Sequence, residues 1–187
     1  GTGSQTAGLA LAGYSGSTPG PSASATEEYD GSSWTTSGTL NTARNYLAGF
    51  GIQTAAVGAT GGPAGKADVE EYDGSSWTTA TSVSNAREIA MSSGVQTDGI
   101  VYGGRVDPGS TSMNKTEGYD GTSWTAQPTM ATARFGSGAN QSSGTASALA
   151  DLTQAEVQIL DGATVTTAEL NILDGVTATT AEINYVD

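Results

Sequence analysis

The stretch EEYDGSSWTT, residues 27–36, decides the fold because it occurs three times in the chain. The same ten letters return at residues 70–79, and the close variant EGYDGTSWTA occupies residues 117–126. In each copy an Asp-Gly pair divides two short runs, and this pair favours a tight turn because glycine accepts positive φ angles. The stretch therefore predicts a β-hairpin that is used three times.

An aromatic pair marks every copy of this hairpin. A tyrosine ends the first strand and a tryptophan begins the second, five residues later in each copy. The chain of 187 residues has no other tryptophan, so we expect one hairpin geometry to recur, with the aromatic rings as its packing core. The aromatic positions are Tyr29, Trp34, Tyr72, Trp77, Tyr119 and Trp124.

Each hairpin belongs to a longer unit. The distance from one hairpin tyrosine to the next is 43 and then 47 residues. Four short strands in a period of about 40 to 50 residues are typical of a propeller blade. In the first full period the predicted strands cover residues 45–53, 54–61, 68–72 and 76–81.

The recurrent charged residues are expected to serve the repeat. Arg44, Arg87 and Arg134 each follow their tryptophan by ten residues, and a glutamate stands two residues before each hairpin tyrosine. Because every copy is alike, the pattern favours ion pairs and hydrogen bonds between blades over a single catalytic copy. Calcium held by the acidic loops is the alternative, although no EF-hand-like loop is present.

The order double glycine, Glu-Tyr-Asp, Trp and Ala-Arg resembles the kelch repeat of galactose-oxidase-like β-propellers over residues 1–141. The resemblance implies a mainly β region, placed at residues 1–150, with three kelch-like four-stranded blades. Propellers close with about four to eight blades, so three copies leave the ring incomplete. Three solutions stay open: the chain is a fragment of a longer propeller, several chains complete one ring, or the sheets pack as an open or prism-like unit.

From residue 151 a second repeat begins, with a period of 13 residues and the pattern of a helix start. In each copy a threonine N-cap precedes a glutamate by three residues as a capping box, with a hydrophobic staple around them. A helix this short cannot stand alone in water, so parallel chains must bury its apolar side, and we expect a homotrimeric stalk over residues 151–187. The capping residues are Thr153, Glu156, Thr166, Glu169, Thr179 and Glu182.

The string TTAELNILDGVTATTAEINYVD, residues 166–187, is very similar to repeats in tail-fibre and other virion proteins of bacteriophages. Such fibres are typically trimeric and extracellular and carry domains that touch the host surface. The resemblance therefore implies a virion protein with a role in host attachment. Since the chain begins at Gly1, we expect either a matured product or a piece of something longer.

Composition narrows the remaining function classes. The chain has no cysteine and no histidine, which removes thiol nucleophiles, imidazole bases and the usual copper and zinc ligands. Adjacent glutamates such as Glu27 and Glu28 point to opposite faces of a strand, so they cannot act as a glycosidase pair. A net charge of −13 repels nucleic acid and anionic lipid, and no apolar run is long enough to span a bilayer. We expect no enzymatic activity, no cofactor and no metal.

These observations predict a structural and adhesive fibre or appendage protein on the virion surface, which presents a receptor-binding β head on its stalk. Its partners are expected to be further copies of itself, other virion proteins and a host glycan or protein. The connections at residues 14–26, 63–67 and 106–116 vary most, and Tyr14 and Arg105 are the candidate receptor contacts. The alternatives are a secreted or cell-surface kelch-like adhesin or lectin of cellular origin, and a purely architectural fibre segment.

Overall fold

The computed structural model describes residues 1–16, 20–106 and 111–136, and the structural statements below concern these residues. The chain divides into two units, Gly1–Ala146 and Ser147–Asp187, and only the first contains described residues. The predicted stalk and all its capping residues lie outside the described residues, so the stalk stays a prediction.

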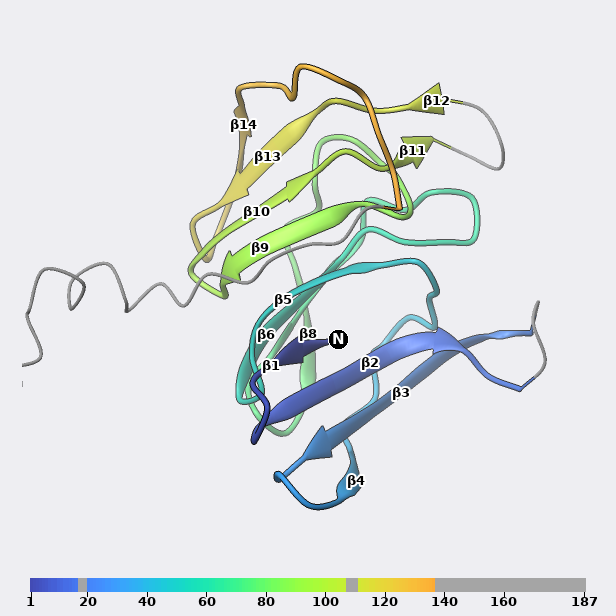
Figure 1. Ribbon diagram of the computed structural model, residues 1–187, viewed down its shortest axis with the longest axis vertical. Helices are drawn as coiled ribbons and strands as arrows, with labels where there is room; N and C mark the ends of the chain where they lie inside the picture. Colours follow the sequence, from blue (N-terminus) through green and yellow to red (C-terminus); the bar gives the residue numbers. More distant parts are fainter. Residues whose placement is uncertain (17–19, 107–110, 137–187) are drawn as a thin grey trace, which may run out of the picture. The chain divides into compact units, whose positions relative to one another are not determined.

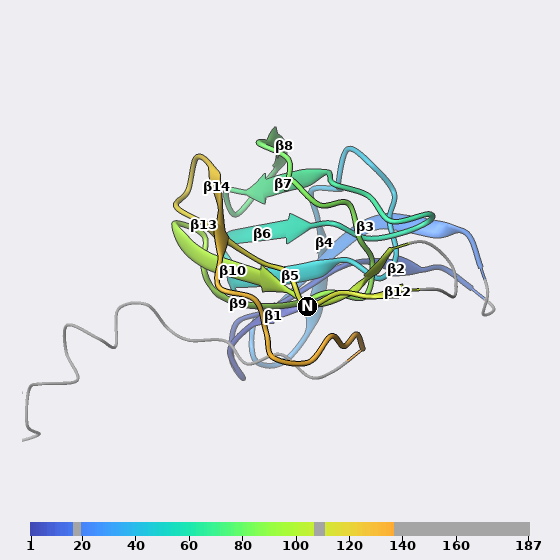
Figure 2. The ribbon, with the colours of Figure 1, turned by 90° about the horizontal axis from the view of Figure 1, so that it is seen from above.

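Three four-stranded antiparallel sheets make up the described part of the first unit (Figures 1 and 2). The described residues contain no helix. The first sheet consists of β1 (Thr2–Gly3), β2 (Gly8–Tyr14), β3 (Ser22–Tyr29) and β4 (Trp34–Ser37). The second consists of β5 (Ala48–Ile52), β6 (Ala55–Ala59), β7 (Val69–Tyr72) and β8 (Trp77–Ala80). The third consists of β9 (Met91–Val95), β10 (Asp98–Tyr102), β13 (Thr116–Tyr119) and β14 (Trp124–Gln127).

The predicted blade pattern is confirmed at the level of these sheets. All four strands predicted for the first full period form, as β5 to β8, and their ends lie within three residues of the predicted bounds. The sequence did not predict the small hairpin of β11 (Arg105–Val106) and β12 (Thr111–Ser112), which is inserted between β10 and β13. Within the described ranges the three sheets do not close a ring.

The Asp-Gly turn is held by its own carboxylate. In the second sheet Asp73 Oδ1 accepts hydrogen bonds of 2.8 Å from the backbone amides of Ser75 and Ser76. Hydrogen bonding, led by the Ser76 amide, lowers the pKa of Asp73 to about 2. Gly74 has a φ of +92°, which a side chain would disfavour. The turns at Asp30 and Asp120 use the same bonds.

The tyrosine and tryptophan of each hairpin face each other directly across the two strands, as predicted. Tyr72 is paired in register with Trp77, and the same pairing holds in the other two sheets. Such cross-strand aromatic pairs fix the register of a hairpin. The ring centroids are 5.1 Å apart for Tyr29 and Trp34, 5.0 Å for Tyr72 and Trp77, and 4.6 Å for Tyr119 and Trp124.

The apolar core lies between neighbouring sheets. Strand β5 contacts both β1 and β9, so the second sheet has the first on one side and the third on the other (Figure 1). Leu9, Leu11 and Leu40 of the first repeat pack with Tyr72 and Trp77 of the second sheet. The core between the second and third sheets is formed by Phe50, Val57, Val69, Val83, Val101 and Tyr119. Burying each of these large side chains contributes about 1.5–3 kcal/mol.

A buried arginine joins the first sheet to the second. Arg44 lies in the connection between them, and its Nη2 is 3.0 Å from Glu70 Oε1 on β7. Its Nη1 also donates to the carbonyl oxygens of Thr60, at 3.0 Å, and Asp68, at 2.7 Å. Both members of the pair are almost fully buried, so each carbonyl contact offsets part of the cost of removing the guanidinium from water.

The same arrangement joins the second sheet to the third. Arg87 forms an ion pair with Glu117 on β13 and donates to the carbonyl oxygens of Gly103 and Lys115. Burial lowers the pKa of Arg87 to about 10, which leaves the guanidinium charged at neutral pH. These are the structural ion pairs that the repeated Ala-Arg sequence predicts.

Two members of the predicted repeat core differ from the others. Trp34 is 52% exposed, whereas Trp77 is 6% exposed. Arg134 is exposed and has no ion-pair partner among the described residues. The physical reason is position: Trp34 lies on the uncovered face of the first sheet, and Arg134 follows the third sheet, after which no further sheet is described. Trp34 still packs on Tyr29, so the hairpin pair forms as in the other copies, but the position in the repeat does not by itself determine burial.

Candidate functional site

The two candidate contact residues lie in one surface cluster at the ends of the strands. Tyr14, at the end of β2, packs edge-on against Tyr46, with ring centroids 5.4 Å apart. Arg105, on β11, binds Glu88 Oε1 at 2.8 Å and lies 5.2 Å from the ring centroid of Phe135. We call these five residues the aromatic–ionic cluster.

The repeat itself positions the cluster. Tyr46 and Ile89 stand two residues after Arg44 and Arg87, and both have a positive φ, of 53° and 52°. Non-glycine residues seldom adopt this conformation, and here the Ile89 amide donates to the Tyr46 carbonyl oxygen at 2.9 Å. Asn45 and Glu88, directly after the buried arginines, are buried, whereas the bend at the following residue brings Tyr46 to the surface and leaves Ile89 half-buried. Tyr46 is 43% exposed as a result.

Charge and burial are combined at this cluster. Glu88 is buried, and both Nε and Nη2 of Arg105 bind its Oε1, so the arginine is held by two contacts. A hydrogen bond with Tyr46 raises the pKa of Tyr14, and the negative charge of Glu88 adds to this increase while Arg105 opposes it. Tyr14 therefore stays protonated at neutral pH, and its hydroxyl is held by the hydrogen bond with Tyr46.

The chemistry of the cluster suits recognition. Phe135 is 43% exposed, and together with Tyr46 it offers an aromatic surface. Aromatic rings of this kind pack on apolar faces of a ligand, while the guanidinium of Arg105 supplies planar hydrogen-bond donors. Carbohydrate rings and peptide segments both present this mixture of apolar and polar groups.

Sequence reasoning found two of the five members. Tyr14 and Arg105 were predicted and are brought together, whereas Tyr46, Glu88 and Phe135 were missed. A signal was present in the sequence, because Glu88 and Phe135 directly follow Arg87 and Arg134, and Tyr46 follows Arg44 by two residues. The residues after each recurrent arginine return to the same end of the sheets, which the repeat could have indicated.

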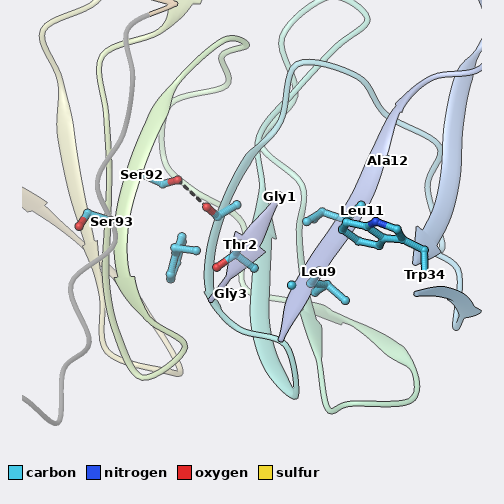
Figure 3. A pocket seen from close by; sticks show the side chains of 13 residues that line it. Gly1, Thr2, Gly3, Leu9, Leu11, Ala12, Trp34, Ser92 and Ser93 are labelled. Carbon is cyan, nitrogen blue, oxygen red and sulfur yellow. Dashed lines mark hydrogen bonds between the residues drawn. The ribbon is translucent and has the colours of Figure 1, made fainter. Parts of the chain in front are cut away.

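A second feature is a hollow of about 650 Å³ beside the inner strands (Figure 3). It is lined mainly by small residues of β1, β2, β5 and β9, together with Leu9, Leu11, Phe50 and Trp34. No ionisable side chain lines it. The Ser92 hydroxyl, at its border, donates to the Gly49 carbonyl oxygen at 2.9 Å and is thereby used in joining two sheets. The hollow offers a surface for packing rather than a reactive group.

Metal binding was tested on the donor atoms of the chain. The chain has no histidine and no cysteine. Within the described ranges, no three Asp or Glu side chains gather closely enough to hold a metal ion. These residues do not fit a copper centre. A search of the same residues for a helix long and apolar enough to cross a membrane finds none.

Comparison with known proteins gives a distant structural likeness and no match in sequence. No family model matches the chain, and no curated protein matches it in sequence. Among solved structures, the chain is similar to a fungal alcohol oxidase of the AA5 family in complex with copper, with a TM-score of 0.49 and 15% sequence identity. The match covers 60% of this chain and 29% of that chain, so this chain spans less than a third of the oxidase's length. The description of the sheets therefore rests on their own hydrogen bonds.

Proposed function

We propose that this chain is a structural and adhesive protein of a virion fibre or appendage, and that its kelch-like β sheets present a host-receptor contact. The observation that carries the proposal is the aromatic–ionic cluster, where exposed rings and a fixed arginine lie together at the ends of the sheets. The similarity of residues 166–187 to phage fibre repeats supports the setting.

The scaffold supports a role in binding. The buried pairs of Arg44 with Glu70 and Arg87 with Glu117 fix neighbouring sheets, so the cluster rests on a rigid base. Recognition surfaces are commonly built from loop residues on such scaffolds. Residues 151–187 would supply a homotrimeric stalk that raises the avidity of several weak contacts on an extracellular surface.

The proposal is tested by adsorption of the purified full chain to candidate host cells and to a glycan array. We expect saturable binding that is lost when Tyr46→Ala and Arg105→Ala are combined, because the ring surface and the guanidinium donors disappear together. Thr78→Ala is the matched control, since Thr78 is also exposed but lies on β8, away from the cluster.

Two results would contradict the receptor contact. Adsorption that is equal for the cluster variant and the control would show that other residues bind. A chain that adsorbs to no cell or glycan, while it still assembles, would favour the architectural fibre segment.

A further inference from the structure

In the described part of the chain, one face of the first sheet and one face of the third sheet have no neighbouring sheet. These two faces carry the two complementary sides of the contact that joins the first sheet to the second and the second to the third. We propose that the third sheet of one copy docks on the first sheet of a second copy, and that two copies so joined complete one ring of six blades. The proposal goes beyond the attachment function, which does not say which surfaces join the chains.

The first sheet carries everything that the second sheet uses to dock. Residues 27–36 and 70–79 are identical in sequence. In the second sheet, Trp77 Nε1 donates to Thr26 Oγ1 of the first sheet at 2.9 Å, and the Tyr72 hydroxyl binds Glu28. The corresponding residues of the first sheet, Trp34 and Tyr29, have no sheet before them in the described part of the chain. The same docking groups are therefore present and unused.

The residues of β2 next to Trp34 on this unused face are small. Gly8 and Ala10 border the hollow of about 650 Å³ together with Trp34, and the hollow also extends along β5 and β9. At the matching place in the second sheet, the Cβ position of Gly58 lies 3.3 Å from Leu11 of the first sheet, so no space remains. A leucine-sized side chain from a preceding sheet could pack over Gly8 and Ala10 as Leu11 packs over Gly58.

The third sheet carries the opposite half of the contact. Ile100 is 37% exposed, whereas Leu9 and Val57, which occupy the same position in the first and second sheets, are 1% and 0% exposed. Thr116 precedes its hairpin tyrosine by three residues, as Thr26 does, so it offers the same hydroxyl acceptor to a tryptophan. A second hollow, of about 370 Å³, covers this face and is lined in part by Ile100, Gly118 and Gln127.

The third sheet lacks the glutamate that binds a tyrosine hydroxyl in the other two sheets, and a glutamine side chain takes its place. Glu28 and Glu71 bind the tyrosine hydroxyls of the following sheets, but Gly118 occupies this position in the third sheet. The Gln127 side chain lies over Gly118, with Nε2 2.9 Å from the position that a Cβ would take. The amide oxygen of Gln127 is thus available to accept a hydrogen bond from Tyr29 of a second copy.

Charge complementarity completes the contact. Arg44 and Arg87 each leave one sheet and neutralise a buried glutamate of the next. Arg134 leaves the third sheet with its backbone fixed, because its amide donates to the Met113 carbonyl oxygen at 3.1 Å. Its side chain and that of Glu27 are both exposed, and neither has an ion pair among the described residues. Arg134 of one copy therefore matches Glu27 of the other.

The number of blades selects the number of copies. The described part of each copy supplies three blade sheets, so on this count two copies give six blades and three copies give nine. Propellers close with about four to eight blades, which favours two copies. If the stalk is a trimer, its three heads cannot all pair with one another, so a ring would also join chains of different stalks.

The contact is tested by cross-linking the full chain with a short bis-maleimide after Thr36→Cys and Thr132→Cys are introduced together. Both threonines are exposed and flank the Glu27–Arg134 contact without belonging to it, and the chain has no other cysteine. We expect a linked species with twice the mass of one chain. The positive control is Thr42→Cys with Thr79→Cys, which places the two thiols on either side of the internal pair of Arg44 and Glu70. The reagent should link these thiols within one chain, which would show that it is long enough to span such a contact.

The matched control is Thr79→Cys with Thr132→Cys. Thr79 has the same local sequence as Thr36, but the face of its sheet is already occupied by the first sheet, so no linked dimer is expected. Glu27→Arg, added to the Thr36 and Thr132 pair, should remove most of the linked dimer, and Arg134→Glu on top of it should restore the dimer.

The possible results separate the alternatives. A linked species of three chains, or a series of larger linked species, would overturn the six-blade ring. The absence of any link between chains would overturn the docking of copies, and it is the result expected if other sheets cover these faces. A linked dimer without adsorption to cells would contradict only the proposed attachment function. Adsorption without a linked dimer would contradict only this inference.

Discussion

Among the described residues, the second sheet is covered by a sheet on both faces, whereas the first and third are each covered on one, although all three are built from nearly the same hairpin. Trp77 and Trp34 belong to identical ten-residue stretches and are 6% and 52% exposed. The repeat sequence thus determines the groups that a sheet offers, and the neighbouring sheet determines whether they are buried. Substitutions at equivalent positions should therefore differ in their effect, and this comparison can be tested directly.

The largest difference is expected between Arg44→Ala and Arg134→Ala. Removing Arg44 leaves Glu70 buried without its cation, which should lower the free energy of unfolding by about 3–5 kcal/mol. Arg134 is exposed, so its removal should change that energy by less than about 0.5 kcal/mol. Urea unfolding of both variants at low protein concentration provides the measurement. Equal losses would show that the pair of Arg44 and Glu70 adds nothing beyond a surface residue.

The tryptophans should show a smaller difference in the same direction. Trp77→Ala removes a buried ring and its bond to Thr26, and we expect a loss of about 3 kcal/mol. Trp34→Ala removes a ring that rests mainly on Tyr29, which is worth about 1 kcal/mol. Thermal unfolding followed by circular dichroism compares them. A Trp34 variant that is as unstable as the Trp77 variant would mean that another surface covers the first sheet in dilute solution.

The hairpin tyrosines test single hydrogen bonds across the sheets. The Tyr119 hydroxyl donates to Glu71 Oε1 at 2.9 Å, and Tyr119→Phe should cost about 1 kcal/mol. Tyr29 has no preceding sheet in the described residues, so Tyr29→Phe should be close to neutral in the dilute chain. The two free-energy changes are measured from the midpoints of denaturant unfolding, with the same dependence of the unfolding free energy on denaturant concentration used for both variants. A neutral Tyr119→Phe would show that water replaces the Glu71 contact without loss.

The smallest effect is expected from acid. The carboxylate of Asp73 has its pKa lowered from 3.8 to about 2 by hydrogen bonds within its turn. The stability contributed by this shift is present above pH 3.8 and is lost as the pH falls toward 2, because protonation removes the acceptor. Melting temperatures measured between these pH values should fall less steeply for Asp73→Asn than for the unchanged chain. Parallel slopes would show that the turn carboxylates are not the source of acid sensitivity.

The sequence predicted the strands and turns of this fold better than it predicted which side chains the neighbouring sheets bury. The three hairpins, the four strands of the second sheet and the buried arginines all follow from residue spacing, because hairpin turns and cross-strand pairs are local. The exposure of Trp34 and Arg134 depends on what lies next to them in space, which the spacing alone does not report. The aromatic–ionic cluster brings together residues from five separate segments. The repeat places Glu88 and Phe135 directly after recurrent arginines, but only the structure shows that they lie beside Arg105.

The order of the buried ion pairs along the chain has a consequence for synthesis. Each arginine precedes the glutamate that it neutralises, Arg44 by 26 residues and Arg87 by 30 residues. Since polypeptides emerge from the ribosome amino terminus first, the cation is already available when the acidic strand appears. Each new sheet can therefore fold onto a finished neighbour that supplies its counter-charge, and growth of the stack has a direction set by translation.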